Sequence, residues 1–340
     1  MLRVCNPLWS HFHEQEPSMS ISLDSPQVHA ISANLHQAFV TSGGQPLWLA
    51  IDGSEIPLTD IDGVDWHQRP SVKVRLQHPE IATHWHPRWF ALHLDRARDA
   101  HILNHSIVWA LEETSPQNLR SGQGRRIAGW FIAAEPTVQA AATHWANLMV
   151  RRVPYAIGWQ LLRLHDPAVL WAVWQTLPRE QHAQWLGPLQ QWHLLNPVGG
   201  LIQLTEPTRG RDTAPRALLP ELSAQQWQDI QNIGPLHHAM QQLDASAHLD
   251  ADAFKQRFQT GLHALRRAKQ LKLNDLHSLS LFAQLAMSRH PLFDQHPELQ
   301  QLLQQRASDE PLGGVLCDLT EQDWQRLCRE ISVPHTPRSH

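Results

Sequence analysis

The chain is poor in cysteine. Its 340 residues include three cysteines, Cys5, Cys317 and Cys328, which lie far apart without a CxxC spacing. An odd, scattered set of this kind excludes a disulfide framework and is typical of a reducing compartment. The N-terminal segment lacks the apolar core of a secretory signal, and no apolar run approaches the ~20 residues of a membrane helix. We therefore expect a cytoplasmic protein with no membrane partner.

Excess positive charge is also missing. The formal net charge is −4 at pH 7 and the pI is about 6.7, whereas a nucleic-acid-binding domain is normally basic. Short basic clusters do occur, the longest at residues 209–216, but such clusters are usually solvated surface or linker. The composition therefore argues against a nucleic-acid partner.

Tyrosine is nearly absent, with one residue, whereas tryptophan and histidine are abundant at 15 and 24. Twelve of the tryptophans lie between Trp48 and Trp192. Two interpretations remain open: the indole rings fill a core, or some are partly exposed anchors at a protein interface, where tryptophan is enriched among energetically dominant residues.

Apolar segments of strand length alternate with helical segments up to Glu206, which predicts an α/β lobe with a mixed sheet and flanking helices. The predicted strands are 47–51, 72–76, 89–94, 126–133, 157–165, 191–195 and 201–205. The predicted helices are 28–40, 97–111, 137–149, 167–177 and 178–186. The segment from Ile127 to Ala133 is the most continuously apolar, so we expect it near the centre of the sheet.

Composition changes after the last of these strands. Residues 207–221 are rich in Pro, Arg and Gly and lack periodicity, which indicates a linker. The segments that follow are amphipathic, with Phe254, Phe258, Leu262 and Leu265 on one stripe. We therefore expect a mobile extension at residues 1–26, with translation starting at Met1 or Met19. This extension would be followed by an α/β lobe at 27–206, a linker at 207–221, an all-α lobe at 222–333 and a tail at 334–340.

The many histidines raise the hypothesis of a metal-binding hydrolase or transferase. Three pairs have the spacing of shared ligands: His101 with His105, His84 with His86, and His11 with His13. A zinc site requires three or four ligands, and none of these pairs has an evident third ligand. The Glu of an HExxH motif is missing between His101 and His105. Satisfied or exposed histidines are the simpler interpretation, and we expect no metal and no other cofactor.

Motifs of nucleophilic catalysis are equally hard to find. The chain has no GxSxG, P-loop or GxGxxG motif. Residues 121–124 form a Gly-containing segment that indicates a loop, and Asp52-Gly53 and Asp62-Gly63 are turn dipeptides. We therefore expect no catalytic residue.

The most informative segment is residues 157–187. Its pattern predicts a strand that runs directly into a helix at Asp166-Pro167, since Asp caps orphan N–H groups and Pro lacks the N–H at N1. A second helix is expected to start with Pro178 in its first turn and to end at Gly187 in a left-handed C-cap. Arg163 is expected to lie on the strand and to tie its end to a neighbouring acid.

The same residues, in this order, resemble the adaptor-chaperones of bacterial type VI secretion, called Tap or TEC. Those proteins carry a domain of unknown function numbered four-one-two-three. The motif residues, for which a structural role is expected, are Arg163, Asp166, Pro167, Gly187, Pro188, Phe293, Asp294 and Pro297. The resemblance extends from about Leu47 to about Leu303. His165 is a departure, because the family more often has Tyr or Trp at that position.

The resemblance implies a protein without enzymatic activity. It would bind a type VI effector toxin in the cytoplasm and load it onto a VgrG-type spike protein, shielding an apolar effector segment until hand-over. A groove between the two lobes is the expected binding surface, because such interfaces offer concave, apolar surface. The alternative remains a histidine-dependent, metal-binding hydrolase or transferase.

Overall fold

A computed structural model describes residues 21–53, 66, 69–78, 80–114, 125–152, 157–205, 219, 221–243, 250–307 and 310–332. The chain divides into two compact units, Met1–Ser223 and Ala224–His340. Several predictions fall outside the described residues: the extension before residue 21, the start at Met1 or Met19, most of the linker, the tail, the His11–His13 pair, the Asp62-Gly63 turn and the loop at 121–124.

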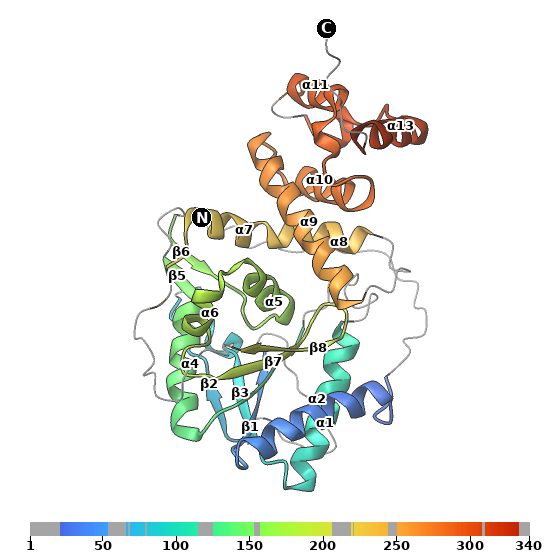
Figure 1. Ribbon diagram of the computed structural model, residues 1–340. Coiled ribbons are helices and arrows are strands. Elements are labelled where there is room, and N and C mark those ends of the chain that lie inside the picture. The colour runs from blue at the N-terminus through green and yellow to red at the C-terminus, as the bar shows by residue number, and fades with distance from the viewer. Residues whose placement is uncertain are drawn as a thin grey trace. The chain divides into compact units, whose positions relative to one another are not determined.

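Six strands form one sheet in the N-terminal unit (Figure 1). Their order is β2-β3-β1-β4-β7-β8, and every strand pair among the described residues is antiparallel. The strands are β1 (Leu47–Ile51), β2 (Ser71–Lys73), β3 (Arg88–Leu92), β4 (Ile127–Ile132), β7 (Gln191–Leu195) and β8 (Leu201–Thr205). The predicted α/β lobe followed by a helical lobe is confirmed. The strand β4 is one of the two central strands, as its continuous apolar character predicted.

Helices cover both faces of this sheet (Figure 1). The helices are α1 (Pro26–Thr41), α2 (Ala97–Glu113), α4 (Glu135–Met149), α5 (Pro167–Thr176) and α6 (Arg179–Leu186), and a 3₁₀ turn, η1, spans Thr83–Trp85. One face packs on α1 and α2 through alternate residues such as Leu47, Leu49 and Ile51. The intervening residues of the strands face α4 and α5, because successive side chains of a strand point to opposite sides.

Tryptophan fills the layer between the sheet and α4. The indole of Trp192 stacks on Trp145 of α4, with ring centroids 4.3 Å apart, and on Phe131, 4.9 Å away. Eight of the twelve tryptophans of this region are buried: Trp48, Trp66, Trp89, Trp130, Trp145, Trp171, Trp185 and Trp192. The core interpretation therefore holds for most of them, while Trp85 and Trp159 are exposed.

A β-bulge in β4 accommodates this packing. Ala50 pairs with Gly129 and Ile51 with Ile127, so Ala128 is the extra residue. Gly129 has a φ of +137°, and a Cβ at this position would lie 2.3 Å from the carbonyl oxygen of His193. Only glycine fits here, because neither the backbone conformation nor the space admits a side chain.

The predicted strand 157–165 is wrong in length and in position. Only Trp159–Leu161 is extended, as β6, and it pairs with β5 (Val150–Arg152) in a separate two-stranded hairpin. Five residues separate β6 from α5, because Leu164 donates its N–H to the carbonyl of Leu162 and so turns the chain. The β5 strand was not predicted, because it begins at Val150, directly after the last residue of α4, with no turn residue between them.

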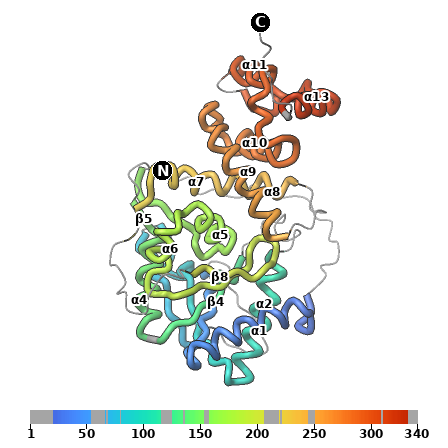
Figure 2. Tube along the Cα trace, viewed as in Figure 1, coloured from blue at the N-terminus to red at the C-terminus, as the bar shows by residue number. Residues whose placement is uncertain are grey.

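Every regular element described after Ser223 is helical (Figure 2). The elements are α7 (Ala224–Gln231), α8 (Ile233–Gln242), α9 (Ala251–Gln270), α10 (Leu276–Ser288), η2 (Phe293–Gln295), α11 (Pro297–Gln305), α12 (Leu312–Val315) and α13 (Glu321–Ser332). The predicted stripe on α9 is buried throughout. As predicted, α10 is central, since it packs against α8, α9 and α12. Among the helices that the structure describes, none combines the length and apolarity needed to cross a membrane.

Candidate functional site

The corner at Asp166-Pro167 is a helix start, as its sequence predicted. The Asp166 carboxylate accepts a hydrogen bond from the Ala168 N–H at 2.9 Å, and Pro167 is the first residue of α5. The Arg125 guanidinium lies 3.8 Å from the same carboxylate oxygen. Arg163 lies in the turn before the cap with its side chain exposed, and within the described residues no ion pair with it occurs. The expected tie to an acid is therefore absent there.

His165 forms a buried pair that the sequence did not reveal. Its Nε2 lies 3.3 Å from a carboxylate oxygen of Asp52, which is 1% exposed at the end of β1. Burial lowers the pKa of His165, and the Asp52 carboxylate opposes that shift in part. The ring is therefore neutral at pH 7, with its Nε2 facing the Asp52 carboxylate. The only signal was an acidic residue directly after a fully apolar strand, which had been interpreted as a turn.

A histidine–aspartate pair is two parts of a catalytic triad, so the third part decides its chemistry. Because Nε2 faces the Asp52 carboxylate, Nδ1 is the ring nitrogen left to act as a base. That atom is buried, and it has no hydrogen-bond partner among the residues the structure describes. A nucleophile would have to lie within hydrogen-bond distance of it. Within that part of the chain, the pair thus joins β1 to the motif corner without activating a nucleophile.

The second motif helix differs from the prediction at both ends. Pro178 is the N-cap of α6 and does not belong to its first turn. Gly187 ends the helix with φ 60° and ψ −127°, so its φ is positive, as a left-handed cap requires, but its ψ is not that of the αL region. A Cβ on Gly187 would lie 2.2 Å from the ring of His144. Close packing of this imidazole, together with the turn into Pro188, explains the unusual conformation.

The C-terminal motif residues lie at the junction of three helices. Phe293 is fully buried against Phe282 and Trp324, with ring centroids 4.8 and 6.0 Å apart. The Arg267 guanidinium of α9 donates to both carboxylate oxygens of Asp294, and its two shortest hydrogen bonds there are 2.9 Å. Pro297 is the first residue of α11. These residues thus contact or begin helices of the C-terminal unit, and their structural role stays a prediction.

The side chains best placed to bind a metal ion are not those of the predicted histidine pairs. The His101 and His105 rings do lie together, 4.3 Å apart, but no third ligand joins either predicted pair within the described ranges. One set of possible ligands, His296, Glu298 and Glu330, has its atoms within 4.8 Å of one another.

The hydrogen bonds of His296 oppose a metal ion at that set. Its Nδ1 accepts the N–H of Glu298 at the start of α11, so the ring proton is on Nε2 and points to Glu330, 3.0 Å away. A nitrogen that carries a proton has no lone pair for a metal. Arg326 also binds Glu298 at 2.7 Å, which supplies the positive charge that this carboxylate needs. The cluster is a helix cap with an ion pair.

Two surfaces of the N-terminal unit remain as candidates for binding. The first is the β5–β6 hairpin, which exposes Ile157, Trp159 and Leu161. The Arg152 guanidinium lies 4.8 Å from the centroid of the Trp159 ring, in a cation–π contact. Clustered exposed apolar side chains of this kind are typical of protein-binding surfaces.

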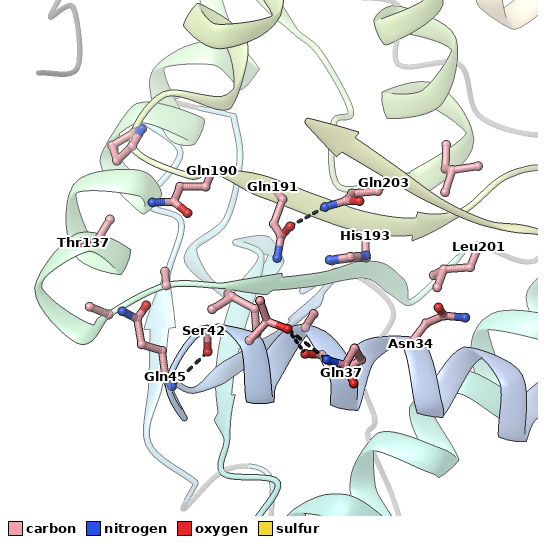
Figure 3. A pocket seen from close by; sticks show the side chains of 17 residues that line it. Asn34, Gln37, Ser42, Gln45, Thr137, Gln190, Gln191, His193, Leu201 and Gln203 are labelled. Carbon is pink, nitrogen blue, oxygen red and sulfur yellow. Dashed lines mark hydrogen bonds between the residues drawn. The ribbon is translucent and has the colours of Figure 1, made fainter. Parts of the chain in front are cut away.

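The second surface is a groove of about 900 Å³ between α1 and the strands β7 and β8 (Figure 3). Asn34 and Gln37 line it from α1, and Gln191, His193 and Gln203 line it from the strands. Burial lowers the pKa of His193 to about 4, so its imidazole is neutral at pH 7. Sequence reasoning missed this groove, because its α1 residues and its β7–β8 residues are more than 140 positions apart in the sequence.

Comparison with known proteins supplies one match. The family model described as a domain of unknown function (DUF4123) matches residues 74–184, which include β3, α2, β4, α4 and the Asp166-Pro167 corner. No curated protein and no solved structure matches the chain. The sequence from Val74 to Gln184 is thus similar to that domain, which includes the N-terminal part of the predicted motif.

Proposed function

We propose that this chain is a non-enzymatic adaptor that binds a type VI secretion effector in the cytoplasm and loads it onto a VgrG-type spike protein. The observation that carries the proposal is the match of residues 74–184 to DUF4123, a family associated with type VI effector adaptors. The order of the motif residues within and after this match, from Arg163 to Pro297, supports the same assignment.

The contacts of the motif residues favour an adaptor over an enzyme. Asp166 caps a helix, His165 binds Asp52, and Asp294 binds Arg267. Each side chain is used to hold elements together, and the basic atom of His165 contacts no nucleophile in the described part of the chain. The exposed hairpin and the uncharged groove offer surface for a partner.

Co-purification tests the first half of the proposal. The tagged chain is expressed with a candidate effector encoded beside it, and the pair is passed through affinity and size-exclusion columns. We expect the effector to co-elute with the chain, since an adaptor must hold its cargo before hand-over.

The matched control is an unrelated cytosolic protein of similar size in place of the effector. An effector that elutes alone, while the chain is folded by circular dichroism, would contradict the proposal. Stoichiometric zinc in the purified chain, lost together with a hydrolytic activity on His165→Ala, would favour the enzyme alternative.

A further inference from the structure

The groove between α1 and the strands β7 and β8 has a lining without charge. Among the described residues that line it there is no Asp, Glu, Lys or Arg. The lining instead contains six carboxamide side chains: Asn34, Gln37, Gln45, Gln190, Gln191 and Gln203. A surface that offers no counter-ion disfavours a charged ligand, because desolvating a charge without a partner is costly. The occupant must therefore be uncharged and able to form hydrogen bonds.

One histidine, His193, is part of the groove lining. His193 is 6% exposed, and its Nε2 is buried without a hydrogen-bond partner among the described residues. An unpaired buried polar group costs about 1–3 kcal/mol. The imidazole is neutral at pH 7, so it adds an uncharged surface to the groove lining.

The carboxamides are held in place by contacts to their neighbours. Gln203 donates from Nε2 to the Oε1 of Gln191 across the β7–β8 pair, and Gln37 donates to the Thr41 hydroxyl (Figure 3). These bonds leave the second N–H of Gln203 and the carbonyl oxygen of Gln37 available to a ligand. A carboxamide offers a donor and an acceptor side by side, which matches the N–H and C=O of a peptide group.

The dimensions fit a stretch of extended chain. Asn34 and Thr41 are seven residues apart on α1, which corresponds to about 10 Å along the helix axis. An extended chain covers that distance with about three residues at ~3.3 Å each. No Trp, Tyr or Phe is among the described lining residues, so the groove offers no aromatic face for a sugar ring. A peptide therefore fits the chemistry better than a saccharide.

We propose that this groove binds an uncharged, extended polypeptide segment, held through its backbone amides by the groove carboxamides. The proposal rests on the adaptor function, which identifies the segment as part of the effector. It predicts a recognition element of at least three uncharged residues in that effector, rich in small or polar side chains.

Two lysines placed in the groove test this. Gln37 and Gln203 are exposed in the free protein, so the double variant Gln37→Lys/Gln203→Lys is expected to fold normally. A peptide segment that binds in the groove would then have to remove water from the two new ammonium groups, which is costly. The probes are overlapping 12-residue peptides covering the candidate effector on an array, followed by titration of the whole effector. We expect the wild-type chain to bind peptides with uncharged centres, and the double variant to bind them and the effector at least tenfold more weakly.

The control is Gln77→Lys, an exposed substitution outside the groove, which should bind as the wild type does. If the double variant binds the effector with unchanged affinity, the groove proposal is wrong and the adaptor function stands. The opposite outcome is that the effector fails to co-purify, while peptides bind the wild-type chain and bind the double variant more weakly. In that case the adaptor function is wrong and the groove proposal stands. Binding of the neutral probe maltotetraose in place of peptides, or no bound peptide at all, overturns the groove proposal.

Discussion

Trp192→Ala is expected to lower the free energy of unfolding of the N-terminal unit by about 4 kcal/mol. Its side chain is 1% exposed and stacks on Trp145 and Phe131. Its indole N–H also donates to the Ala128 carbonyl at 3.2 Å, next to the bulge at Gly129. Alanine would leave a cavity between the sheet and α4 and an unpaired carbonyl at the bulge. Chemical denaturation followed by near-ultraviolet circular dichroism measures the loss.

Trp159→Ala is the matched control, because this tryptophan is 38% exposed on the β5–β6 hairpin. Its replacement is expected to change stability by less than about 1 kcal/mol. A similar loss for both variants would contradict the assignment of Trp192 to the core of the fold.

Asp294→Ala is expected to destabilise the C-terminal unit by about 3 kcal/mol. The Asp294 side chain is 7% exposed and binds the Arg267 guanidinium in a bidentate pair. Without the carboxylate, a largely buried guanidinium keeps one hydrogen bond among the described residues, to the Pro291 carbonyl at 2.5 Å. Thermal unfolding of the purified variant measures the effect.

Two further variants separate the charge pair from general surface effects. Asp294→Leu combined with Arg267→Met should recover part of the loss, because it removes both charges together. Arg326→Ala, whose acidic partners are exposed, should cost far less than Asp294→Ala. A double variant less stable than Asp294→Ala alone would contradict the unpaired-charge explanation.

The sequence predicted local structure well wherever a single element carried its own signal. The strand at Leu47–Ile51 and the start of α5 at Pro167 were found at their observed positions, because an apolar run and an Asp-Pro cap are local features. Thr320 and Asp323 exchange reciprocal hydrogen bonds at the start of α13, in a capping box that the Thr-x-x-Asp spacing signals locally.

Features that depend on tertiary contacts were not predictable in this way. The predicted strand 157–165 is shortened because its continuation turns at Leu164 toward α5. Asp52 and His165 are 113 positions apart, and only the fold brings them to 3.3 Å. The same holds for the groove, whose helix and strand residues show no shared pattern along the chain.

One consequence concerns His165, the position at which the chain departs from the sequence pattern that it resembles. An aromatic side chain in its place would leave Asp52, which is 1% exposed, without this partner. The histidine therefore provides a polar partner for the buried Asp52 carboxylate, directly after β1.

The most direct test of the adaptor claim uses the spike as bait. An immobilised VgrG-type protein is incubated with the effector, with and without the purified chain, and bound protein is quantified. The account predicts that the spike retains the effector only when the chain is present. Equal retention of the effector in the absence of the chain, or no retention in its presence, would contradict it.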